Sequence, residues 1–282
     1  GGAPDWIGAT WTISCDGGFV RWNLIMVGCG NMGGALLSRW IKLGGVGVTV
    51  VDPGEPKLPV GVKWVKSVDD LDPSERFDAL ILAVKPQLID VAIPPAAKFV
   101  KDSGCVVSIA AGASAAKVSA AAGDISALRL MPNMPARVGR GVSGLYADDT
   151  ATKDHRELGT LLGEAVGEAI WLDDEDQIDR MTAAAGSGPG YVFEFARTYQ
   201  KAVEAQGFDP KDARRLVIET MAGCMALALE DEAGFEDLRN SIMSKGGTTA
   251  AGVNALNHDG VLDDRLNAAL TAAYTRAVEL RD

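Results

Sequence analysis

A glycine-rich segment near residue 30 has the residue types and spacing that bind the phosphates of a dinucleotide. Gly28, Gly30 and Gly33 fill the three glycine positions of a G-x-G-x-x-G motif, between a short apolar run and an amphipathic stretch. In this motif the first glycine makes a tight turn and the second lets a pyrophosphate approach the backbone, while the following helix offers free N–H groups. The segment therefore predicts a pyrophosphate site at Gly28, Gly30, Asn31, Met32 and Gly33.

The next apolar run ends on an acidic residue, Asp52, which stands 24 residues after Gly28. A carboxylate near this spacing accepts hydrogen bonds from the adenosine 2′-hydroxyl and repels a 2′-phosphate. The same side chain also suits the start of the Pro53-Gly54 turn, so both interpretations stay open. Asp52 predicts a cofactor site for NADPH or NADH in which NADH competes well.

Three later segments, 83–87, 108–112 and 131–135, each follow or end an apolar run. Ligands of doubly wound sheets bind beyond the carboxyl ends of the strands, so we expect these segments to line one crevice. The alternatives are a solvated position for Lys85 and, for Asn133, a turn amide whose hydrogen bonds are already satisfied. The cofactor residues expected here are Ala83, Val84, Lys85, Pro86, Ala110 and Asn133.

A second candidate site begins at Gly246-Gly247-Thr248-Thr249, which opens a stretch of small residues. Free N–H groups at such a helix start form an anion site that suits a carboxylate. Ordinary N-capping by Thr248 or Thr249 is the alternative interpretation. Near the middle of the chain, Ser187 is the expected N-cap of a helix that spans 190–206.

The elements that position these residues change type near residue 174. Short apolar runs alternate with amphipathic stretches before it, which predicts βαβ units and a mostly parallel sheet. After it the sequence predicts helices alone. We expect strands at 24–27, 46–51, 79–84, 105–110, 127–131 and 142–147. We expect helices near 31–43, 87–101, 114–122, 152–165, 176–206, 210–231, 235–244, 248–257 and 261–280.

These elements predict an α/β chain in three parts. An N-terminal extension of unknown role covers 1–22, and a Rossmann-like dinucleotide-binding domain covers 23–174. An all-helical domain for substrate binding and dimerisation covers 175–282. Apolar residues spread over more than one face of the helices at 211–230 and 261–280, so we expect a homodimer with interleaved helices.

Composition excludes several other classes of protein. The 282 residues include 27 Lys and Arg against 38 Asp and Glu, a net charge of −11 that disfavours nucleic acid and anionic membranes as partners. No membrane span or signal peptide is expected. The 2 histidines argue against a histidine-rich metal site, and no metal is expected. The 4 cysteines suit buried, reduced thiols in a cytoplasmic protein.

Taken together and in this order, the motifs resemble those of the pyrroline-5-carboxylate reductase family. The most specific are GSGPGY at 186–191 and SKGGTTAAGVNAL at 244–256. The resemblance implies NAD(P)H-dependent reduction of the imine 1-pyrroline-5-carboxylate to L-proline, in dimers that gather into larger rings. It makes Thr249 the catalytic residue, hydrogen-bonded to the ring nitrogen. It also implies a substrate site formed by Ser244, Gly246, Gly247, Thr248 and Thr249.

The chemistry of an imine fits what these motifs lack. An imine nitrogen is itself basic and arrives protonated, so orientation of two reactants replaces a positioned acid or base. Neither His155 nor His258 falls in a motif. Lys245 stands where the family usually has proline, so we expect the substrate loop to differ there in shape or charge.

Two other functions remain as alternatives. A β-hydroxyacid dehydrogenase shares the expected layout, but it carries a catalytic lysine soon after a glycine pair on the long helix. Here residues 191–195 occupy that place and the next lysine is Lys201. A non-catalytic nucleotide-binding regulator is the other alternative, and the intact segment 246–249 argues against it.

Overall fold

The computed structural model describes residues 12–13 and 19–281. The chain forms two compact units: the first ends at Gly186 and takes in the chain again from Tyr274, and the second is Ser187–Ala273. Most of the expected extension at 1–22 lies outside the described residues. Within it, the short strands β1 (Thr12–Ile13) and β2 (Phe19–Val20) pair antiparallel.

The first unit contains an eight-stranded sheet in which each neighbouring pair is parallel except β8 and β9. This confirms the mostly parallel sheet. The chain runs from β3 outward through β4 to β5 and then crosses back to β6 on the other side of β3. From one edge, the strands are β10 (Gly167–Trp171), β9 (Gly141–Ala147), β8 (Ala127–Met131), β7 (Val100–Ser108), β6 (Phe77–Leu82), β3 (Trp22–Val27), β4 (Val46–Val51) and β5 (Lys63–Val65).

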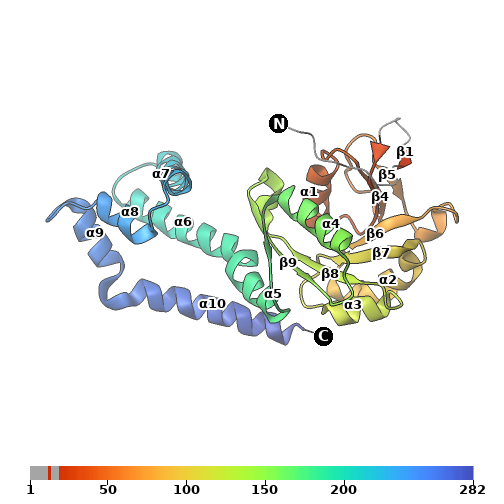
Figure 1. Cartoon of the computed structure of the whole chain (residues 1–282). Helices are drawn as coiled ribbons and strands as arrows, with labels where there is room; N and C mark the ends of the chain where they lie inside the picture. The colour runs from red at the N-terminus through yellow and green to blue at the C-terminus, as the bar shows by residue number, and fades with distance from the viewer. Residues whose placement is uncertain (1–11, 14–18, 282) are drawn as a thin grey trace, which may run out of the picture. The chain divides into compact units, whose positions relative to one another are not determined.

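Helices cover both faces of this sheet (Figure 1). Leu24 and Met26 of β3 belong to the core beneath α1 and α4, while Ile25 belongs to the core beneath α2 and α3. This alternation follows from the two-residue period of a strand. A continuous run of apolar residues therefore fills both cores at once. The covering helices are α1 (Asn31–Trp40), α4 (Lys153–Glu164), α2 (Ile89–Ala97) and α3 (Ala115–Ala121).

Three expectations for the first unit were wrong in detail. The helix expected at 87–101 ends at Ala97, and β7 already begins at Val100. β6 ends at Leu82, so Ala83 and Val84 lie in the turn that follows it. Both edge strands, β5 and β10, were missed because their residues are half-buried or exposed and form no continuous apolar run.

The second unit, residues 187–273, consists of helices and the turns between them and contains no strand, as expected. Asp209 starts its longest helix, since the carboxylate accepts hydrogen bonds from the N–H groups of Lys211 and Asp212. Only two residues of this unit, Ala213 and Val217, are buried. Its helices are α6 (Gly188–Ala205), α7 (Pro210–Glu230), α8 (Phe235–Ser241), α9 (Thr248–Leu256) and α10 (Val261–Glu279), the last of which runs on into the first unit.

The cysteines differ in their surroundings more than expected. Cys105 lies buried in β7, where burial raises the pKa of its thiol to about 12. Cys29 is half-buried in the glycine turn, and Cys224 is exposed on α7 in the single chain, so the expectation of a buried thiol is wrong there. Cys15 lies outside the described residues. Among the described helices, none has the length and apolar character needed to cross a bilayer.

Candidate active site

The glycine turn lies where β3 and β6 end side by side. Gly28 has φ +87°, which favours glycine, and a Cβ there would lie 2.6 Å from the carbonyl oxygen of Ala83. The N–H of Ala83 in turn donates to the carbonyl of Val27 at 2.9 Å. The structure therefore brings the G-x-G-x-x-G segment and the 83–87 segment together at the point where the strand order reverses.

Gly30 and Gly33 have different roles in this turn. A Cβ on Gly33 would lie 2.9 Å from Cε of Met26, so this glycine lets α1 pack closely on the sheet. A Cβ on Gly30 would meet no atom within 4 Å. Gly30 is the N-cap of α1, where no side chain caps the helix and no acidic residue lies in the first turn. Open space and free N–H groups at Asn31 and Met32 fit a diphosphate.

Asp52 joins this turn to the end of β4. Its Oδ2 accepts a hydrogen bond from the N–H of Cys29 at 2.6 Å, and its Oδ1 accepts one from Gly54 at 2.8 Å. The turn interpretation of Asp52 is thus confirmed, and two of its acceptor positions are already used. Burial and the nearby Asp52 charge raise the pKa of the Cys29 thiol, which keeps it protonated.

The segment after β7 lies next to the same edge of the sheet. Ser108 pairs in register with Leu82 of β6, and the N–H of Ile109 donates to the Leu82 carbonyl at 3.1 Å. Ala110 is buried, and its N–H donates to Oγ of Ser108 at 3.3 Å. Lys85 is exposed at the start of the 3-10 turn Pro86–Leu88, which matches its solvated alternative.

The side chain of Asn133 bridges two backbone segments by hydrogen bonds. Its side chain is buried, Oδ1 accepts from the N–H of Val142 at 2.9 Å, and Nδ2 donates to the carbonyl of Ala185 at 3.1 Å. The geometry matches the turn-amide alternative, because the amide is committed to two backbone partners. The expectation of a side chain free to contact a cofactor is wrong for Asn133.

The helix expected at 176–206 is interrupted. It comprises α5 (Asp176–Met181), a π-helical turn at Thr182–Gly186 and then α6. π-helical turns inside α-helices are frequent at functional sites. Ser187 occupies the N-cap position of α6 but its side chain makes no capping hydrogen bond, so that expectation was wrong. The small residues of this segment show no sequence signal that separates a π turn from an α turn.

The second candidate site is a tight turn before α9. The N–H of Gly247 donates to the carbonyl of Ser244 at 2.9 Å, and Gly246 has φ +72°. A Cβ on Gly247 would collide with Oγ of Ser244. The positive φ therefore favours glycine at 246, and a side chain at 247 would require Ser244 to move.

Gly247 is the N-cap of α9, and no side chain caps this helix. Thr248 and Thr249 follow it as the first two helical residues, and neither hydroxyl takes part in a hydrogen bond within the described part of the chain. The N-capping alternative for the two threonines is therefore wrong. Both hydroxyls and the first N–H groups of α9 are left for a ligand, and Lys245 is exposed beside them.

Comparisons with known proteins identify the family. A family model described as pyrroline-5-carboxylate reductase dimerisation matches residues 175–280. A pyrroline-5-carboxylate reductase of Vibrio alginolyticus is 33% identical over 92% of this chain and 97% of its own length. One of Pseudomonas aeruginosa is 34% identical with the same two coverages. The chain belongs to the pyrroline-5-carboxylate reductase family.

Solved structures of this family share the fold. The pyrroline-5-carboxylate reductase of Coxiella burnetii is 30% identical and superposes with a TM-score of 0.82 over 93% of this chain and 99% of its own. A pyrroline carboxylate reductase of Plasmodium falciparum, solved with NADP bound, is 21% identical with a TM-score of 0.80 and the same coverages. The β-hydroxyacid dehydrogenase and regulator alternatives are not favoured by these comparisons.

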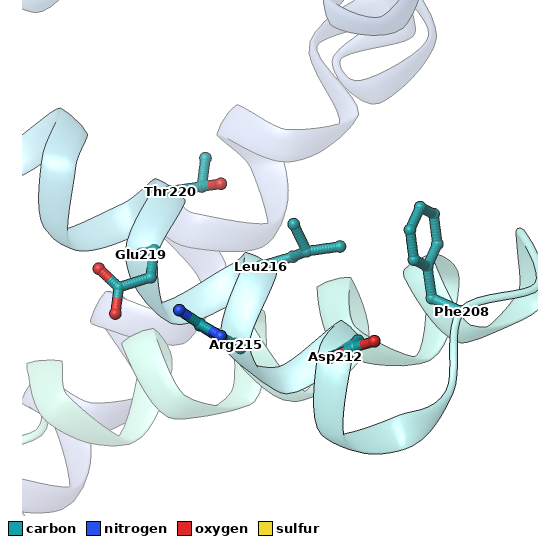
Figure 2. Close-up of a pocket in the computed structure, with 6 residues that line it drawn as sticks. All are labelled: Phe208, Asp212, Arg215, Leu216, Glu219 and Thr220. Carbon is teal, nitrogen blue, oxygen red and sulfur yellow. The ribbon is translucent and has the colours of Figure 1, made fainter.

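One feature of this family member lies outside the expected sites. A groove of about 360 Å³ runs along α7 and the turn before it (Figure 2). Its lining combines charged, polar and apolar side chains, and the sequence predicted no binding site there. Because apolar residues lie on more than one face of α7, the sequence carries no signal that sets these residues apart. The groove is lined by Phe208, Asp212, Arg215, Leu216, Glu219 and Thr220.

The histidines and acidic residues of the described segments form no metal site. No group of three or more His, Cys, Asp or Glu side chains gathers there in a way that could hold a metal ion. His155 is buried and structural, since Nδ1 accepts from the N–H of Thr152 at 3.2 Å and Nε2 lies 3.0 Å from the carbonyl of Ser103. His258 is exposed beside Asp259.

Proposed function

We propose that this chain reduces the cyclic imine 1-pyrroline-5-carboxylate to L-proline with NADPH or NADH. The observation that carries the proposal is the uncapped start of α9, where two threonine hydroxyls and free N–H groups follow the turn Ser244–Gly247. Such a group of donors and acceptors suits a small substrate that carries both a carboxylate and a ring nitrogen. Membership of the family supports the same reaction.

The cofactor residues form one set at the ends of β3, β4, β6 and β7. The free N–H groups of α1 bind the pyrophosphate, and Gly28 and Gly30 keep side chains out of its way. Asp52 binds the adenosine ribose through its remaining acceptor positions. When bound, the nicotinamide supplies the hydride. Asn133 supports this set indirectly, because its amide fixes the backbone at residue 185. The set proposed is Gly28, Gly30, Asn31, Met32, Gly33, Asp52, Ala83, Val84, Lys85, Pro86 and Ala110.

The proposed substrate residues form two groups, one that binds the carboxylate of the ligand and one that binds its imine nitrogen. The N–H groups of Thr248 and Thr249, with Ser244, Gly246 and Gly247, bind the carboxylate through the partial positive charge of the helix start. The hydroxyl oxygen of Thr249 accepts a hydrogen bond from the protonated imine. The reaction then depends on orientation, because the nitrogen already carries its proton.

The assembly and location belong to the same proposal. The chain forms a homodimer through its helical unit, and we infer that the dimers gather further into rings. The cytoplasmic location expected from the cysteine content stays a proposal that cell fractionation tests. The overall activity is tested by following NAD(P)H absorbance with pyrroline-5-carboxylate and then with 3-hydroxyisobutyrate. With 3-hydroxyisobutyrate, which is an alcohol, the assay is supplied with NAD(P)+ and a reaction would form NAD(P)H. Formation of NAD(P)H from that substrate, without loss of NAD(P)H with pyrroline-5-carboxylate, would overturn the proposed reaction.

The role of Thr249 is tested by two substitutions. Thr249→Ala removes the hydroxyl and should lower kcat/KM by roughly 10–100-fold, which corresponds to a hydrogen bond to a charged group of about 1.5–3 kcal/mol. Thr249→Ser keeps the hydroxyl and should retain most of the activity. Circular dichroism checks that both variants fold. An unchanged kcat/KM for Thr249→Ala would remove Thr249 from the mechanism.

A further inference from the structure

The end of α10 is tied to α5 by a cluster of charged and polar groups in the first unit. The hydroxyl of Tyr274 donates to Oδ1 of Asp176 at 2.9 Å, and Nη2 of Arg281 donates to the same oxygen at 2.9 Å. Nε of Arg281 donates to Oδ2 of Asp179. Arg180 adds a hydrogen bond to Asp176 at 2.8 Å. Two segments almost 100 residues apart are thereby joined.

Asp179 is the buried member of this cluster. Its side chain is 2% exposed, whereas that of Arg281 is 34% exposed. A buried carboxylate is strongly unfavourable without a charged partner. Arg281 is the cation that the structure places against it, so the position of α5 depends on residue 281.

The residue before Arg281 contacts a different segment. Gly112 ends the segment that follows β7 and has φ +78°, and a Cβ on it would collide with the carbonyl oxygen of Leu280. The backbone at 280 therefore lies directly against the turn at 110–112. That turn is part of the edge of the sheet where Ser108 and Leu82 pair.

Asp179 also stands one turn before the π-helical segment. α5 ends at Met181, and the π turn Thr182–Gly186 follows without a break. Asn133 holds that turn through the carbonyl of Ala185. Residues 280–281 thus contact both the helix that leads into the π turn and the turn after β7.

We propose that Arg281 is a positioning residue for the cofactor site, acting through Asp179 and through the contact of Leu280 with Gly112. This rests on the proposed function, which places Ala110 among the cofactor residues. Arg281 itself does not touch the cofactor. It keeps the turn at 110–112 and the start of the π segment in the arrangement that the cofactor binds, so its loss weakens cofactor binding more than it slows the chemical step.

The test compares Arg281→Ala, Arg281→Lys and a control on α10, the helix that ends at Glu279. Arg281→Ala should raise the KM and the fluorescence-measured Kd for NAD(P)H by about three- to tenfold, with a smaller change in kcat. Arg281→Lys keeps a cation beside Asp179 and should recover part of the loss. Hydrogen exchange at residues 109–112 of the cofactor-free protein should become faster in Arg281→Ala.

The control is Arg276→Ala. Arg276 pairs with Glu279 at 2.8 Å on the same helix, but both side chains are more than half exposed. It should leave the Kd, the KM and the exchange rates unchanged. Wild-type Kd and unchanged exchange in a folded Arg281→Ala protein would overturn the inference. NAD(P)H binding is measured without the imine, so a failure of the proposed reaction is a separate result.

Discussion

At the scale of single residues, the carboxylate of Asp52 has two uses. It accepts one backbone N–H from the glycine turn and one from its own Pro53-Gly54 turn. A carboxylate offers about four acceptor positions, so two remain for the hydroxyls of a ribose. Its negative charge repels a 2′-phosphate at the same place. If Asp52 binds the ribose as proposed, it is expected to favour a cofactor without that phosphate.

We expect NADH to support the reaction at least nearly as well as NADPH. The measurement is kcat/KM for the two cofactors under identical conditions. A preference for NADPH above about tenfold, or roughly 1.4 kcal/mol, would show that Asp52 does not face the ribose. The comparison needs no variant, because the charge of Asp52 in the unaltered protein is what should discriminate between NADH and NADPH.

The hydrogen bonds by which Asn133 bridges two backbone segments give a second prediction at the scale of single residues. Asn133→Asp keeps the size and can still accept from Val142, but an ionised carboxylate cannot donate to the carbonyl of Ala185. The free energy of unfolding should fall by about 2–4 kcal/mol because a buried charge faces a carbonyl oxygen. Urea unfolding measures this loss.

The control for that substitution is Asn240→Asp. Asn240 is exposed, and its Oδ1 accepts from Arg239 at 3.0 Å, a bond that aspartate preserves. Its stability should stay within about 0.5 kcal/mol of the unaltered protein. If Asn133→Asp were equally stable, the amide would have no role in holding the π turn.

At the scale of elements, a substitution in the glycine turn before α1 can test cofactor binding without disturbing the fold. A Cβ at Gly30 meets nothing within 4 Å in the protein, so the turn leaves space there that the fold itself does not use. Gly30→Ala should fold normally and raise the Kd for NAD(P)H by roughly 10–100-fold, as expected for the loss of charge-assisted hydrogen bonds of about 1.5–3 kcal/mol.

Gly44→Ala is the matched control for Gly30→Ala. A Cβ on Gly44 also meets nothing within 4 Å, and this glycine follows α1, at the opposite end from the pyrophosphate site. Thermal unfolding and fluorescence titration of both variants are the measurements. An unchanged Kd for Gly30→Ala would contradict the placement of the pyrophosphate at this turn.

The elements show how far sequence reasoning reaches in this chain. The central strands and the glycine turn were predicted because buried parallel strands are continuous apolar runs and the turn has fixed spacing. β5, β10 and the start of β7 were missed, since exposed strand residues such as Asp102 and Glu168 carry no such signal. The hydrogen bond from Asn133 to Ala185 joins residues 52 positions apart, and the one from Arg281 to Asp179 joins residues 102 positions apart. No local sequence pattern reveals such contacts.

At the scale of the whole molecule, the helical unit lacks a core of its own. Ala213 and Val217 are its only buried residues, whereas large apolar side chains along α6, α7 and α8 are exposed. Phe193, Leu229 and Phe235 are each more than 70% exposed. Burial of such residues provides most of the stability of a helical domain. A partner subunit must therefore supply the missing contacts.

We expect an obligate dimer whose interface buries more than about 2,000 Å² and is largely apolar. Sedimentation at micromolar concentration should give twice the chain mass of 29.5 kDa or a larger multiple. Dilution should reduce activity and helix content together, because the helical unit depends on the partner. A stable, active 29.5 kDa monomer would contradict this expectation.

The order of the two units along the chain has a consequence for recombination. The helical unit, Ser187–Ala273, is preceded and followed in sequence by segments of the same sheet-containing unit. A chimera between two family members that exchanges the helical unit therefore needs two crossovers, one at each end. A single crossover near residue 187 would also replace the end of α10, so that Arg281 and Asp179 would come from different parents. Natural exchange of this unit is constrained in the same way, since the two boundaries must be inherited together.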